Sequence, residues 1–92
     1  MTVRLVVNME AASGKRDEFA AAFASLCSSV REEPGCQRYE LYQSTDRPDH
    51  FVLMERWSDP EALTVHSQRP RERGVDLASL RAGPSKMERY TE

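Results

Sequence analysis

The sequence predicts a small single domain, residues 1–92, of the α+β class, and three observations lead to this prediction. Four short segments alternate between apolar and polar side chains with a period of two, as strands do. Two longer segments place apolar residues every three or four positions, as helices do. Along the 92 residues these segments follow the order strand, helix, strand, strand, helix, strand.

The first strand is expected from Val3 to Met9. One of its faces carries only large apolar side chains, and the other carries Arg4, Val6 and Asn8. A helix is expected to follow Ser13 and Gly14, with one apolar stripe of Phe19, Phe23, Leu26 and Val30. Pro34 and Gly35 are expected to end this helix.

A hairpin is expected next, with strands at Cys36–Thr45 and His50–Trp57 and a turn at 46–49. On its first strand, strict alternation places Tyr39 and Leu41 on one face. Cys36, Arg38, Glu40 and Tyr42 then lie on the other. On its second strand, Glu55 shares a face with Phe51, Leu53 and Trp57. A carboxylate in such company needs a partner or a role.

The second helix has a strong start signal at Asp59 and Pro60, where a capping carboxylate precedes a proline suited to the first helical position. It carries His66 before Pro70 interrupts it. A further helical stretch is expected around Arg71 to Arg81. The last strand is expected at Lys86–Thr91.

This order matches the ferredoxin-like arrangement, in which right-handed crossovers place both helices on one face of a four-stranded antiparallel sheet. The opposite face would then be bare. Its apolar side chains need cover, which a second copy of the chain can supply by pairing the two sheets face to face. The sequence therefore predicts a homodimer.

Composition excludes several classes of function. The chain has 13 Lys and Arg against 15 Asp and Glu, with the signs mixed, so no basic stripe for nucleic acid is expected. No signal-peptide core and no apolar segment long enough to span a membrane occur, which predicts a cytoplasmic protein. Cys27 and Cys36 are expected to be small packing residues. No GxGxxG motif, P-loop or clustered metal ligands occur, so neither a cofactor nor a metal is expected.

Several blocks together resemble the antibiotic biosynthesis monooxygenase (ABM) family. They are Glu33-Pro34-Gly35-Cys36 with Tyr39-Glu40-Leu41, then Phe51 to Trp57, then Asp59, Glu61-Ala62 and His66, together with Gly14. The resemblance implies a dimeric α+β barrel with a pocket between sheet and helices in each protomer. It also implies one of several chemistries, because family members oxidise anthrones or quinols without a cofactor, isomerise small metabolites, or degrade haem.

The haem-degrading branch fails on the residues. Members of this branch have an Asn on the first strand, which Asn8 matches here. They also have an axial His after the proline near position 70. The segment from Arg71 to Arg81 contains none. No haem is therefore expected.

The first hypothesis is a cofactor-independent monooxygenase acting with O₂ on a small quinol-type or anthrone-type aromatic. His66 is the candidate base, because an imidazole titrates near neutral pH; the alternative is a histidine that only packs. Trp57 is a candidate to shape the pocket, or else a core anchor. Substrate contacts are assigned to four further residues that could equally be satisfied within the sheet. They are Asn8, Tyr39, Tyr42 and Glu55.

Two other functions stay open. An isomerase or other enolisation catalyst would use the same base and oxyanion donors without O₂. A dimer that binds a metabolite without catalysis is the third alternative, because no group of side chains here is diagnostic of catalysis.

Overall fold

The computed structural model describes residues 1–69 and 77–92, and within them the predicted order of elements is confirmed. The strands are β1 (Val3–Glu10), β2 (Cys36–Gln43), β3 (His50–Trp57) and β4 (Lys86–Thr91). The helices are α1 (Arg16–Val30), α2 (Pro60–Gln68) and the single turn α3 (Leu77–Leu80). Most of the helical stretch expected at 71–81 lies outside the described residues.

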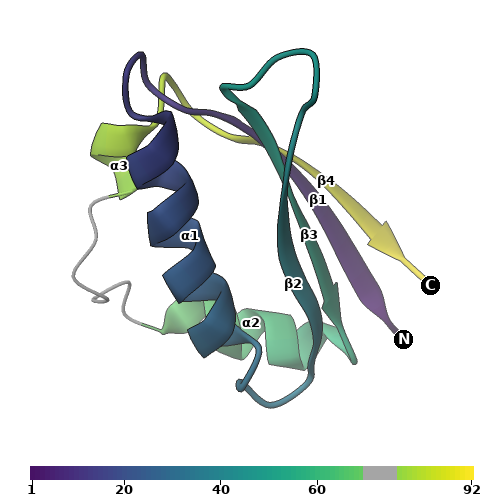
Figure 1. The fold of residues 1–92 in the computed structure, drawn as a ribbon. Helices are drawn as coiled ribbons and strands as arrows, with labels where there is room; N and C mark the ends of the chain where they lie inside the picture. The colour runs from purple at the N-terminus through teal and green to yellow at the C-terminus, as the bar shows by residue number, and fades with distance from the viewer. Residues whose placement is uncertain (70–76) are drawn as a thin grey trace.

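The sheet has the strand order β2-β3-β1-β4, and every neighbouring pair is antiparallel. All three helices lie on one face of the sheet (Figure 1). This is the predicted ferredoxin-like α+β fold. The face that the helices cover is called the inner face below, and the opposite face is called the outer face.

The inner face carries the core, as the alternation on β1 and β3 predicts. Val3, Phe19 and Trp57 are fully buried. Phe19 of α1 packs against Phe51 of β3 with a distance of 4.8 Å between ring centroids. Burial of such large apolar side chains is the main stabilising contribution in a domain of this size.

Two details differ from the predicted pattern. On α1, Cys27 is buried and Leu26 is only half-buried, because the inward row runs through positions 19, 23, 27 and 30 and Leu26 flanks it. On β2, the register shifts between Cys36 and Arg38. This irregularity places Cys36 opposite Trp57 and against the core, so its predicted position on the outer face is wrong.

The start of α2 follows its sequence signals. Asp59 caps the helix, since its Oδ1 accepts a hydrogen bond of 2.8 Å from the backbone N–H of Ala62, and Pro60 occupies the first turn. The backbone N–H of Ser58 donates to the Gly35 carbonyl at 2.8 Å. The beginning of α2 is thereby held against the beginning of β2.

Gly35 makes this close approach possible. Its φ is +82°, a conformation that side-chain-bearing residues rarely adopt. A Cβ at this position would lie 2.5 Å from the Cβ of Ala62. The absence of a side chain therefore lets the segment that leads into β2, with Glu33 near its start, lie directly beside α2.

Candidate active site

A cavity of about 380 Å³ lies between the inner face of the sheet and the helices. This volume is within the range of small-molecule sites. Its walls are mostly apolar and come from every described helix and from all four strands. Among the apolar lining residues are Leu5, Val7, Met9, Phe23, Leu26 and Leu63. Leu26 is half-buried rather than buried because it faces this space.

His66 lies on α2 and lines the cavity. Its Nδ1 is 2.9 Å from Oε1 of Glu33, a buried carboxylate on the segment between α1 and β2. When Nδ1–H donates to that carboxylate, the lone pair of the neutral ring is on Nε2. The pair thus has the arrangement of a base and its orienting carboxylate.

Two aromatic rings fix the plane of His66. Trp57 lies against it with 4.7 Å between ring centroids and 30° between the planes, and Tyr39 meets it edge-on at 5.7 Å. Arg69, just past the end of α2, places its Nε 3.3 Å from the same Glu33 oxygen. The imidazole is therefore held by contacts from three directions.

Glu55 is the second buried carboxylate of this site, and it also lines the cavity. Its Oε1 accepts a hydrogen bond of 3.0 Å from Nε1–H of Trp57. Burial raises the pKa of Glu55 above its ordinary value of 4.5, and the Trp57 hydrogen bond and the charge of nearby His66 oppose that rise. The site therefore contains two carboxyl groups in different electrostatic settings.

The structure brings together three of the six residues proposed from the sequence. His66, Tyr39 and Glu55 line the cavity. Trp57 lies behind them, fully buried, with its indole ring against His66. This position is that of the core anchor, the alternative weighed for this residue, and it holds both His66 and Glu55 in place.

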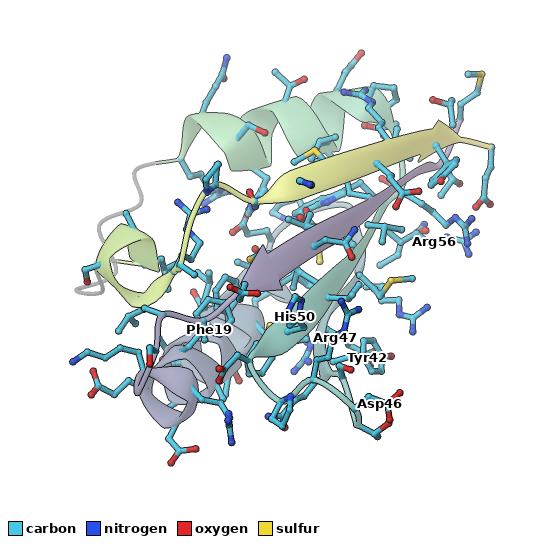
Figure 2. The ribbon with its side chains drawn as sticks, turned by 90° about the horizontal axis from the view of Figure 1, so that it is seen from above. Phe19, Tyr42, Asp46, Arg47, His50 and Arg56 are labelled. Carbon is cyan, nitrogen blue, oxygen red and sulfur yellow. The ribbon has the colours of Figure 1, made fainter. Side chains whose placement is uncertain are left out.

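Asn8 and Tyr42 are not brought to the cavity. Both are exposed on the outer face, because they occupy the even positions of β1 and β2 that point away from the helices. Tyr42 instead bonds to Arg38 and Glu40 on its own strand. In Figure 2, Tyr42 and Arg56 lie on the side of the sheet away from the helices, and Phe19 lies on the helix side.

The sequence reasoning missed Glu33 and Arg69. In the sequence analysis, Glu33 is named only in the Glu-Pro-Gly block. A carboxylate at this position lies between the end of a helix and a Pro-Gly turn, where local structure can fix its side chain. Arg69 follows α2 and gives no comparable signal.

Among the described residues, no three His, Cys, Asp or Glu side chains gather as metal ligands, and no helix has both the length and the apolar character of a membrane span.

Comparison with protein families identifies the family of this chain. The family model for antibiotic biosynthesis monooxygenases matches residues 2–73. The chain belongs to the ABM family. The matched residues include β1, β2 and β3, together with Glu33 and His66.

Relatives extend this result. The chain is 33% identical over 54 residues to YcnE of Bacillus subtilis (strain 168), to which a monooxygenase activity is provisionally assigned. That alignment covers 59% of this chain and 57% of YcnE, little more than half of each.

Two solved structures show the same fold. Rv0793 from Mycobacterium tuberculosis is 23% identical with a TM-score of 0.87, covering 100% of this chain and 95% of that one. SnoaB from Streptomyces nogalater, described as a cofactor-independent oxygenase, is 22% identical with a TM-score of 0.86, covering 99% of this chain and 92% of that one. At these identities the likeness concerns the fold alone.

Proposed function

We propose that this ABM protein is a cofactor-independent monooxygenase that oxidises a small quinol-type or anthrone-type aromatic with O₂, with His66 as the general base. The observation that carries the proposal is the hydrogen bond between His66 Nδ1 and the buried Glu33 carboxylate at the wall of an apolar cavity. Membership of the family and the likeness to SnoaB support it.

This oxidation requires a general base and an apolar cavity from the protein. Nε2 of His66 removes a proton from the activated C–H or O–H of the substrate, and the resulting carbanion or phenolate gives one electron to O₂. Recombination of the two radicals forms a peroxide. An anthrone-type CH₂ then becomes C=O, with one water released and the proton returned from His66. The apolar walls exclude water from the anion, and Glu33 stabilises the imidazolium that forms.

The test is O₂ uptake with a panel of anthrones and quinols, using the two histidines of the chain as a matched pair. His66→Ala is expected to lower kcat/KM by about 10²–10⁴-fold, the usual contribution of a general base. His50→Ala is the control, because His50 pairs with Glu10 on the surface at 2.7 Å and does not line the cavity.

A second variant tests the role of Glu33. Glu33→Gln keeps the shape but removes the charge, and we expect a loss of turnover together with a displaced pH-rate profile. Turnover that is unchanged under nitrogen would select the isomerase alternative. Tight binding of the aromatic without product under air would select the alternative of a binding protein.

We also propose that two copies pair through their outer faces. Val6, Val52 and Met54 are only half-buried there, and Tyr42 and Tyr90 are 43% and 44% exposed. Val52→Glu, at the middle of this face, should shift the mass in light scattering from two chains to one. Ser28→Glu on the exposed side of α1 should leave it unchanged, and a single-chain mass for the wild type would disprove the pairing.

A further inference from the structure

Arg81 is fixed at one end of the cavity by the backbone around it. It follows α3 and forms a bridge with Ala11, just past the end of β1. On either side, the N–H of Ala12 donates to the Leu80 carbonyl at 2.7 Å and the N–H of Ala82 donates to the Glu10 carbonyl at 2.8 Å. The Arg81 side chain starts from a rigid point and lines the cavity.

The guanidinium of Arg81 is incompletely bonded. Its Nε is buried and has no hydrogen-bond partner in the part of the chain that the structure describes. Nη1 reaches the Ser85 hydroxyl only at 3.5 Å, and no carboxylate of the described residues pairs with this side chain. A buried N–H of a cation without an acceptor is unfavourable. The two terminal Nη groups, rather than the occluded Nε, form the edge of the guanidinium that can bind a carboxylate through two parallel hydrogen bonds.

This end is distant from the proposed base. Glu55, beside His66, pairs with Leu5 on β1, and Arg81 pairs with Ala11 six residues further along. Six residues of strand span about 20 Å between backbone positions. The long side chains reach inward from both ends, and the wall between them is apolar, with Val7, Met9 and Leu77.

We propose that Arg81, assisted by Ser85, binds a carboxylate of the ligand, so that the molecule in this cavity is an aromatic acid rather than a neutral aromatic. The apolar body would lie along β1 and its reactive carbon at His66. The inference rests on the proposed function for the position of the reactive end. The acid-binding end itself depends only on Arg81 and the cavity.

The test compares the binding of anthracene-2-carboxylic acid with that of its neutral amide. Binding is measured by the fluorescence of the ligand, under nitrogen so that no turnover occurs. The wild type is expected to bind the acid at least about 10-fold more tightly than the amide, the range of a charged hydrogen-bonded pair. Arg81→Met should remove this preference, and Arg81→Lys should retain part of it. Arg47→Met, on the exposed β2–β3 turn and outside the cavity lining, is the control and should keep it.

Each result decides the inference. Equal binding of acid and amide by the wild type, or binding of neither, would overturn it. A preference that survives in Arg81→Met but is lost in Arg69→Met would place the acid at the His66 end and also overturn it. Thermal unfolding of each variant identifies any that fails to fold, in which case Arg81→Lys carries the comparison. Acid preference without O₂ uptake would disprove the oxygenase proposal alone.

Discussion

The inner and outer faces of this one sheet differ in how they treat charge. On the inner face, Glu55 is buried and bonded to Trp57, and the helix-side carboxylate of Glu33 is buried above this face and bonded to His66. On the outer face of a single chain, the charges are exposed and pair laterally, as in Arg4 with Glu92 at 2.6 Å. Alternation along a strand therefore places neighbouring residues in two different environments, one at the cavity and one at the exposed surface.

The largest effect that distinguishes the faces is expected from removing one aromatic ring that packs against the inner face and one that lies on the outer face. Phe19→Ala should lower the free energy of unfolding by about 3–5 kcal/mol, because the ring is fully buried against Phe51. In the single-chain Val52→Glu background, Tyr42→Ala should cost no more than about 1 kcal/mol, since its bonds to Arg38 and Glu40 are exposed there. Urea unfolding measures both. Equal losses would mean that the outer face is as well packed as the inner one.

A smaller effect concerns the turn that brings Glu33 to His66. Gly35→Ala should cost about 2–4 kcal/mol, from its positive φ and from the contact of the new Cβ with Ala62. Gly14→Ala is the matched control. Its φ is +77° but nothing lies within 4 Å of a Cβ there, so about 1 kcal/mol is expected.

The two glycine variants also separate stability from function. Because Gly35 holds α2 against the start of β2, its variant should lose O₂ uptake beyond what unfolding explains. The Gly14 variant should keep full activity per folded molecule. Equal activities would show that the position of Glu33 does not depend on this turn.

The smallest effect is a pH dependence that arises from Glu55. Burial raises its pKa above 4.5 in the folded chain, so the folded state holds this proton more tightly than the unfolded state does. The contribution of Glu55 to stability is therefore greatest at low pH and falls as pH rises from 4.5 through its folded pKa.

Glu55→Gln removes this dependence and keeps an oxygen for Trp57. The free energy of unfolding of the variant minus that of the wild type should increase with pH across that window and then level off. Denaturant unfolding at a series of pH values measures the difference. A difference that is independent of pH would show that Glu55 titrates alike in both states.

The fold could be predicted from the sequence because each strand repeats its pattern over eight or fewer residues, α1 has an apolar row at helical spacing, and α2 has a start signal at Asp59. The inward direction of Glu55 and Trp57 follows from the same alternation. The contact between Glu33 and His66 could not be predicted in this way. The two residues are 33 positions apart, and local periodicity carries no information on the distance between such residues in the fold.

The roles of Asn8 and Tyr42 show the opposite limit. Their residue types suit substrate binding, but their positions in the alternation place them away from the cavity, and that information was available in the pattern itself. Trp57 could be assigned either way, because a pattern places a ring on the inner face without saying whether a ligand or a neighbouring side chain will contact it.

The irregularity at the start of β2 determines where this strand tolerates the deletion of a residue. Cys36 pairs with Trp57 and Arg38 with Arg56, so Gln37 is a supernumerary residue between two regular pairs. It stays at the surface, where its Oε1 accepts a hydrogen bond from Nε of Arg56 at 3.0 Å. Elsewhere in a strand, deleting one residue turns every later side chain to the wrong face. Here a deletion of Gln37 would leave Tyr39 pointing at the cavity, so β2 can be shortened at this one point without losing its orientation.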